Sequence, residues 1–320
     1  MLGAMFANII ASLIRLPVAG PNRLRPLVAI VIGVMLGSSF TPALFDRITL
    51  WAPSLIFMVG YLIVAALVVV PFYRKIAGFD LSTAYFAGMP GGLMEMMIIG
   101  KDAGADERSI ILAHTSRIVL VVTLVAIWFR VVQGIDLSDR SQFGIPFSEI
   151  PENELIILAI VGAFGYFLGR FLHLPAPMLL GPTIVSAAVY SLGIIHNPPP
   201  RELVIIAQIF LGTIVGCRFI GAEPKAILKA IGLGLGATTL MLILTFSFAF
   251  AFYQMFGQTL EQLVLAYSPG GLAEMSLVAL AMNADIAYVA SHHLVRISFV
   301  MMMAPILFKF FSRADNDLKK

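Results

Sequence analysis

The chain has 320 residues, of which 59% are hydrophobic and only 12% are charged, and its formal net charge is +3. A soluble domain carries about 25% charged residues, and a soluble globule of this size could not hide so much apolar surface. The composition therefore excludes a disordered chain, a nucleic-acid-binding surface and a cytosolic enzyme. The long apolar runs lack the alternation of a transmembrane β-barrel, so they predict an all-α polytopic membrane protein.

We expect about ten to eleven transmembrane elements, because each span needs about 20 apolar residues and a short loop. The first element, 2–16, has no basic n-region and no A-x-A cleavage site, so we interpret it as a retained helix and not as a signal peptide. The other elements are expected at 26–45, 52–73, 82–100, 106–132, 152–171, 176–196, 199–219, 224–255, 260–281 and 284–311. Two of them, 82–100 and 260–281, are interrupted by the tripeptide Pro-Gly-Gly.

An internal duplication relates the two interrupted elements. Segment 90–96 reads PGGLMEM, and segment 269–275, which lies 179 residues later, reads PGGLAEM. Between 90–117 and 269–296, 10 of 28 positions are identical without a gap. The matches include rare polar residues, which two unrelated apolar helices would not share. The sequence therefore predicts two structurally repeated halves, each with a Pro-Gly-Gly-broken helix.

The duplication and the polar stretches together predict the domain boundaries. The second half has an apolar segment at 178–195 that the first half lacks, so the first half is expected to be shorter at its N-terminal end. The predicted division is 1–132 for the first membrane repeat, 133–151 for a polar connector, 152–311 for the second membrane repeat and 312–320 for a polar tail.

The repeated Pro-Gly-Gly segments are the first candidates for a substrate-binding site. In hydrocarbon an unpaired backbone group costs several kcal/mol, so a broken helix survives only inside protein or beside a water-filled cavity. Broken segments at matching positions of two repeats indicate the central site of a transporter. If every element crosses once, the two broken segments run parallel, whereas one re-entrant segment would make the repeats inverted; we favour inversion, because a shared site at a pseudo-twofold axis is the commoner use of such motifs. The alternative is a kink or loop that only packs. The predicted lining residues are Pro90, Gly91, Gly92, Pro269, Gly270 and Gly271.

Glu95 and Glu274 lie in the first helical turn after each break. A carboxylate there interacts favourably with the helix dipole and can form a capping box, which is a purely structural role. Ionisable groups inside membrane spans are costly, however, and are candidates for function. The second interpretation is therefore a carboxylate that lines the cavity and binds a cation or relays a proton.

Aspartate, histidine and arginine recur on the helix that follows each break. The two sets are Asp106, His114 and Arg117, and Asp285, His293 and Arg296. Their spacing places them on one helical stripe, which must face the bundle interior and not lipid. Two interpretations of the arginines stay open, namely ion pairs with Glu95 and Glu274 or an anion-binding site formed with the glycine amides. Each histidine is a candidate proton relay or a simple donor to a backbone carbonyl, and Asp106 is expected to cap its helix.

The doubled motif PGGLxEM, followed by Asp, His and Arg on the next helix, resembles the bacterial membrane family called AbrB-like. The resemblance covers both halves of the chain and implies a multi-pass protein of the bacterial inner membrane. It implies little about activity, since family members are labelled putative ammonia monooxygenase, regulator of gene expression and transporter-like permease.

We expect a secondary transporter of a small polar or anionic solute, with a central site where the repeats meet. A membrane-embedded regulator that affects gene expression without transport is the alternative. An ammonia-monooxygenase-like enzyme is a distant third, because five scattered histidines and the single cysteine, Cys217, predict no metal site, and no catalytic motif is present. No catalytic residue and no cofactor is predicted.

The expected partners are the lipid bilayer and a small-molecule or ion ligand, with no nucleic acid. The pairs Gly33/Gly37 and Gly165/Gly169 have the Gly-x-x-x-Gly spacing that lets helices approach closely. This spacing serves internal packing and a homo-oligomer equally well.

Overall fold

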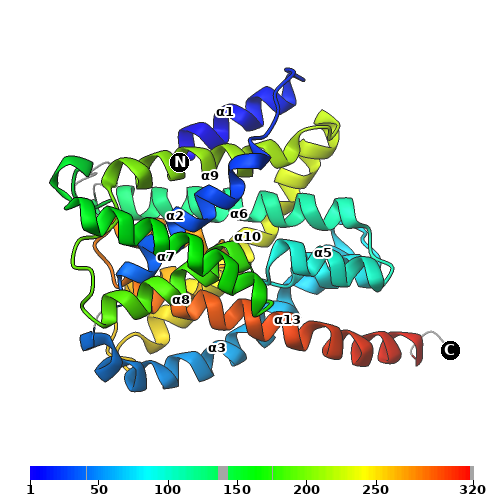
Figure 1. The fold of residues 1–320 in the computed structure, drawn as a ribbon. Coiled ribbons are helices and arrows are strands. Elements are labelled where there is room, and N and C mark those ends of the chain that lie inside the picture. Colours follow the sequence, from blue (N-terminus) through cyan, green and yellow to red (C-terminus); the bar gives the residue numbers. More distant parts are fainter. Residues whose placement is uncertain (41, 136–142, 175, 318–320) are drawn as a thin grey trace. The chain divides into compact units, whose positions relative to one another are not determined.

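The computed structural model describes residues 1–40, 42–135, 143–174 and 176–317, and in these residues all regular structure is helical (Figure 1). The predicted all-α class is therefore confirmed. The α-helices are α1 (Leu2–Leu13), α2 (Arg25–Ser38), α3 (Pro42–Lys75), α4 (Leu81–Gly88), α5 (Leu93–Asp102), α6 (Glu107–Val131), α7 (Glu152–Phe171), α8 (Pro177–Ser191), α9 (Arg201–Gly216), α10 (Pro224–Phe252), α11 (Leu260–Tyr267), α12 (Leu272–Ala281) and α13 (Ile286–Asp317).

Several of these helices are suited to a bilayer. Among the described residues, six stretches are long and apolar enough to cross a membrane, which makes the chain a multi-pass helical membrane protein. They are Thr49–Lys75, Glu107–Val131, Glu152–Phe171, Arg201–Phe219, Pro224–Phe252 and Ile286–Ser312, and the shorter apolar helices are Leu2–Leu13, Pro177–Ser191 and Leu272–Ala281. The larger count of ten to eleven elements stays a prediction.

The helices form two compact units, each built from three stretches of the chain. The first unit comprises Met1–Ala52, Ala126–Ile220 and Ser276–Ala290, and the second comprises Pro53–Val125, Gly221–Met275 and Ser291–Lys320. The duplication predicts a different division, into two sequence repeats joined by the connector 133–151, and that division stays a prediction. Residues 136–142 of the connector lie outside the described part.

The two predicted helix breaks are confirmed, and both lie in the second unit. Helix α4 ends at Gly88 and α5 begins at Leu93, while α11 ends at Tyr267 and α12 begins at Leu272. The residue before each proline is extended, with ψ near 131° at Met89 and 136° at Ser268, as expected of a residue that precedes proline. Each break is therefore a short extended segment between two half-helices.

Helices α4 and α5 form a hairpin. They pack against each other, and the backbone N–H of Asp106, just before α6, donates to Thr83 Oγ1 in the first turn of α4 at 2.9 Å. The hairpin therefore begins and ends at the same level. From Asp106 to Arg117 the chain rises about 16 Å, roughly half of a hydrocarbon core of about 30 Å. Because Arg117 contacts the end of α4, the tip of the hairpin lies beside the middle of α6.

A side chain caps the start of each half-helix before the break. The carboxylate of Asp80 accepts from the backbone N–H of Thr83, and the hydroxyl of Thr259, 179 residues later, accepts from that of Gln262. Partial burial alone would raise the pKa of Asp80, but hydrogen bonds from Ser82 and Thr83 outweigh it and hold that pKa below its ordinary value.

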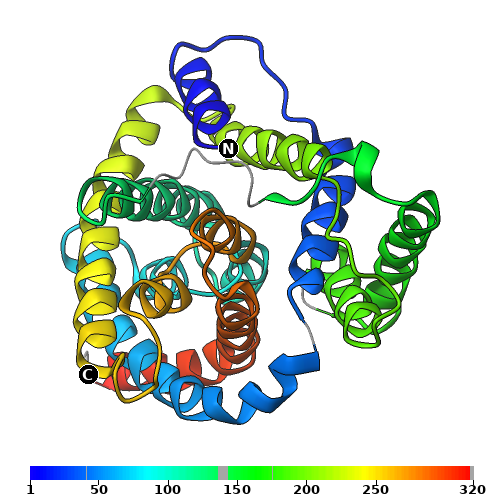
Figure 2. The same cartoon turned by 90° about the vertical axis from the view of Figure 1, so that its left-hand side faces the viewer.

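Helices α4 and α11 run in opposite directions within the second unit. Helix α4 is antiparallel to α13, since Tyr85 donates to Ala304 O at 3.0 Å while the later residue Gly91 lies against the earlier residue Val300. Helix α11 is parallel to α13, because its successive carbonyls face successive residues of that helix. Figure 2 shows α11, drawn in gold, enclosed by α3, α10 and α13. The two half-helices therefore approach their breaks from opposite sides.

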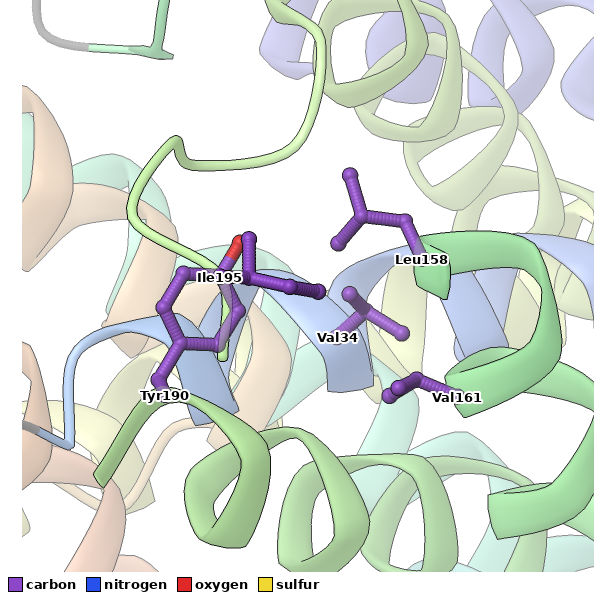
Figure 3. Packing of buried hydrophobic residues seen from close by; sticks show 5 residues of the cluster. All are labelled: Val34, Leu158, Val161, Tyr190 and Ile195. Carbon is purple, nitrogen blue, oxygen red and sulfur yellow. The ribbon is translucent and has the colours of Figure 1, made fainter. Parts of the chain in front are cut away.

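The first unit is held together by close helix packing. A cluster of Val34, Leu158, Val161, Tyr190 and Ile195 joins α2, α7 and the end of α8 (Figure 3). A Cβ on Gly33 or Gly37 would collide with the backbone of α8, and one on Gly165 would do the same. These glycines therefore serve contacts inside the chain, which is one of the two roles expected of them.

Candidate functional site

The candidate site lies where α6 and α13 meet the ends of the broken half-helices in the second unit. Arg117 Nη1 donates to the carbonyl of Met89, the last residue before Pro90, at 3.2 Å. His114 Nε2 lies 2.9 Å from the carbonyl of Phe86. Since the last carbonyls of a helix have no intrahelical donor, these two side chains cap the C-terminal end of α4.

The same contacts recur 179 residues later. Arg296 Nη1 donates to the carbonyl of Ser268, and His293 Nε2 lies 2.9 Å from the carbonyl of Leu265. Arg296 makes one further bond, from Nη2 to the carbonyl of Gly270 at 2.7 Å. In each copy the histidine and the arginine both lie 28 residues after their acceptors. Both breaks are therefore capped in the same way.

The contacts of the histidines determine where their protons lie. Nε2 of each histidine faces a carbonyl, which can only accept, so that nitrogen carries the proton. Nδ1 lies 3.1 Å from the Nη2 of Arg117 or Arg296, which can only donate, so Nδ1 is the acceptor. This arrangement fits a neutral imidazole that orients the arginine. A proton relay through His114 or His293 would have to break one of these bonds.

The two guanidinium groups are buried cations, and each has one hydrogen-bond donor that is not used. Arg117 and Arg296 are 3% and 2% exposed, and the Nε of each is buried without a hydrogen-bond partner. Arg296 lies within electrostatic range of Arg117, and both lie within range of the Tyr61 hydroxyl. Neither guanidinium forms an ion pair with a carboxylate of the described residues. The expected pairs with Glu95 and Glu274 are thus replaced by backbone carbonyls at the helix ends.

The glutamates instead lie over the other side of each break. A Cβ on Gly92 would collide with the carboxylate of Glu95, and one on Gly271 would collide with that of Glu274. Each carboxylate, at the third position of its half-helix, therefore folds back toward the residue that precedes the helix, as in a capping box. Glu274 is 7% exposed and Glu95 is half-buried. The capping interpretation thus accounts for their position, and it leaves a role as proton carrier open.

The two breaks converge on one stretch of α13. Gly270 receives a hydrogen bond from Arg296, while a Cβ on Gly91 would lie 2.9 Å from Cγ1 of Val300. Arg296 and Val300 are four residues apart, so the two contacts lie about 6 Å apart along α13. The glycines have no positive φ in either break, so they are needed for space: Gly92, with φ near −67°, leaves room for Glu95. Pro90 and Pro269 stand at the tips between these contacts.

Several residues near the arginines carry no signal in the sequence. Tyr61 on α3 bonds to Thr245 on α10 at 2.8 Å. Ser54 on α3 bonds to Tyr267 just before the second break and to His292 Nε2 at 2.8 Å. These contacts give His292 a hydrogen-bond partner, whereas Ala113 stands at the matching position of the first repeat. A repeat comparison cannot detect such residues, because they occur once.

The aspartates before α6 and α13 cap those helices. Asp106 accepts from the backbone N–H groups of Arg108 and Ser109, as expected, and Asp285 accepts from that of Tyr288. The described residues contain no group of three or more His, Cys, Asp or Glu that could hold a metal ion.

Comparison with known proteins yields a family but no solved relative. The chain is similar to the Putative regulator AbrB of Escherichia coli (strain K12), with 24% identity over 325 residues that cover 98% of this chain and 89% of the relative. It is also similar to the Uncharacterized protein YhjN of Bacillus subtilis (strain 168), with 24% identity over 255 residues that cover 75% of this chain and 66% of the relative. No solved structure matches. The family model described as Transition state regulatory protein AbrB matches residues 1–312, which takes in both breaks with their caps, and the chain therefore belongs to the AbrB family.

Proposed function

We propose that this protein is a secondary transporter that carries a small anionic solute through a site at the two helix breaks. The observation that supports this most is the pair of buried guanidinium groups, each with an unpartnered Nε and no carboxylate partner among the described residues. A buried cation is costly unless it is paired. A carboxylate or phosphate group is the ligand whose geometry suits guanidinium donors.

The charges around the breaks suggest that a proton accompanies the anion. Two arginines contribute about +2 and two glutamates about −2, while the two capped C-termini and the two N-termini contribute about −0.5 and +0.5 each and cancel. The site is therefore roughly neutral when both glutamates are ionised. An anion that enters adds one negative charge, which protonation of Glu95 or Glu274 offsets. Glu95 is the better candidate because it is half-buried and reaches solvent more easily.

We further propose that the two Pro-Gly-Gly segments belong to inverted repeats. The repeated caps and the opposite directions of α4 and α11 support this interpretation. Repeats inverted about a central site allow one half to rock against the other, which gives alternating access. Since both relatives come from bacteria, we assign the protein to the bacterial inner (plasma) membrane. The proposal assigns it no enzymatic activity.

Transport assays in proteoliposomes test the proposal. Uptake of labelled acetate, lactate, succinate and inorganic phosphate would be measured with and without an inward proton gradient. We expect at least one of these anions to accumulate, with uptake that depends on the gradient. Glu95→Gln should abolish the dependence on the gradient. Arg117→Gln should abolish uptake, because the binding site loses one of the two arginine charges that attract the anion.

Folding controls accompany each variant. Arg117→Lys keeps the charge and should retain weak uptake, and Lys225→Gln, which removes an exposed cation at the start of α10, should transport as the wild type does. Size-exclusion profiles and thermal unfolding in detergent separate loss of function from loss of fold. Accumulation of none of the four anions, or uptake that survives in folded Arg117→Gln, would refute the proposal.

A membrane-embedded regulator is the second candidate, favoured by the name of the Escherichia coli relative, Putative regulator AbrB. Such a protein would bind an anion at the same arginines without moving it. Isothermal titration of the four anions, combined with the flux assay, distinguishes the two: saturable binding that requires Arg117, with no flux under any gradient, identifies a sensor.

A further inference from the structure

An apolar groove lies on the second unit, beside the first helix break. It has a volume of about 890 Å³ and is walled by α3, α4 and α13. Its walls include Leu67 and Val70 of α3, Tyr85 of α4, and Phe299 and Met303 of α13. From Val59 to Lys75, the outermost lining residues of α3, the helix rises about 24 Å, which exceeds the roughly 15 Å depth of one leaflet of hydrocarbon.

One end of the groove is basic. Arg74 and Lys75 line it in the last turn of α3, and both side chains are exposed. None of the described residues that line the groove is acidic. The apolar stretch of α3 ends at Lys75 and that of α13 ends at Ser312, next to the lining residue Phe311. The basic end therefore lies at the level where both helices leave the hydrocarbon, which is where phospholipid headgroups are found.

We propose that this groove binds an anionic phospholipid, with the phosphate at Arg74 and Lys75 and an acyl chain along α3 and α13. Basic pockets between transmembrane helices are the usual sites for anionic headgroups. The groove matches both parts of such a molecule, because its length suits the acyl chain and its charge suits the headgroup. A zwitterionic lipid carries a positive group beside its phosphate and loses the advantage of the two cations.

The bound lipid would also contact the first helix break, at Met89. Met89 lines the groove, and its carbonyl accepts the hydrogen bond from Arg117. An acyl chain in the groove packs against Met89 and Tyr85 and so restricts the movement of α4. Bound lipid should therefore stabilise the folded protein against unfolding.

Native mass spectrometry of the delipidated protein tests the proposal. The protein would be titrated with phosphatidylglycerol or phosphatidylcholine of identical acyl chains, and in a third arm with inorganic phosphate. We expect phosphatidylglycerol to bind about 25-fold more tightly than phosphatidylcholine and to raise the unfolding temperature. Each cation near a headgroup contributes about fivefold in affinity, so Arg74→Gln/Lys75→Gln should weaken phosphatidylglycerol about 25-fold and bring it to the level of phosphatidylcholine.

Two further variants separate the parts of the site. Ala66→Trp fills the apolar groove and should reduce the binding of both lipids while the cations remain. Lys225→Gln/Lys229→Gln removes two exposed cations of α10 and should change nothing. Each variant is first shown to be folded by its unfolding transition without lipid. Equal affinity for the two lipids, unchanged binding in Arg74→Gln/Lys75→Gln, or stabilisation by inorganic phosphate alone would each overturn the proposal.

Discussion

Replacement of Gly271 by alanine should displace the carboxylate of Glu274 from the second break. Alanine fits the backbone, because Gly271 does not have a positive φ. Its Cβ, however, would occupy the position of the Glu274 carboxylate. That carboxylate would have to leave the N-terminal end of α12, and the half-helix would lose its charge–dipole interaction and its cap.

The expected cost follows from the burial of the carboxylate. Loss of an N-terminal cap costs about 1 kcal/mol on average, and a charge at a partly buried helix end contributes up to about 2 kcal/mol. Glu274 is 7% exposed, so Gly271→Ala should lower the free energy of unfolding by about 2 kcal/mol. Gly92→Ala should cost about 1 kcal/mol, because Glu95 is only half-buried.

Denaturant unfolding in detergent micelles, followed by circular dichroism, measures these energies. Gly232→Ala in α10 is the matched control, because a Cβ there would have no atom within 4 Å, and alanine should stabilise the helix by up to about 1 kcal/mol. The double variant Gly271→Ala/Glu274→Gln should cost no more than the larger single change. Strictly additive costs would refute the view that the glycine exists to make room for the carboxylate.

Three further predictions use the same unfolding measurement. Asp80→Ala should lower the free energy of unfolding by about 1 kcal/mol at neutral pH, because α4 loses its cap. The pKa of Asp80 is lowered in the folded protein, so the wild type should lose this advantage as the pH falls below about 3.9. A constant difference between the two proteins down to about pH 2 would contradict this account. His114→Ala and His293→Ala should each cost about 2 kcal/mol, because each leaves a buried carbonyl and an arginine donor unmet, and costs that differ by more than about 1 kcal/mol would argue against equivalent breaks. Gly165→Ala should cost about 1–3 kcal/mol, since its Cβ would meet the backbone at Pro182, whereas Gly60→Ala, where a Cβ would meet no atom within 4 Å, should show no loss.

The sequence predicts the helical class and both breaks because these depend on local chemistry. Proline removes a donor and restricts the residue before it, so the interruptions at Pro90 and Pro269 follow directly from the motif. The stripe of histidine and arginine is also predictable, because a charged residue within a span must face protein.

The partners of the arginines could not be predicted from the same pattern. Periodicity assigns Arg117 and Arg296 to the inner face, and electrostatics then favours the nearby glutamates as partners. Each break, however, frees carbonyls at Met89 and Ser268 whose position depends on how the hairpin folds back along α6 or α13. The constant separation of 28 residues between donor and acceptor in both copies is the signal that could have revealed this, once a hairpin is assumed.

The interleaved construction of the second unit has a consequence for biosynthesis. Its stretches 53–125, 221–275 and 291–320 are separated by segments of the other unit, so a ribosome must deliver nearly the whole polypeptide before α13 can close around α3 and α11. Until then, the hairpin of α4 and α5 is capped by His114 and Arg117 of α6, but Gly91 lacks its contact with Val300 of α13. Nascent chains that stall before α13 should therefore be recognised by membrane quality-control proteases, and neither half should persist when it is expressed alone.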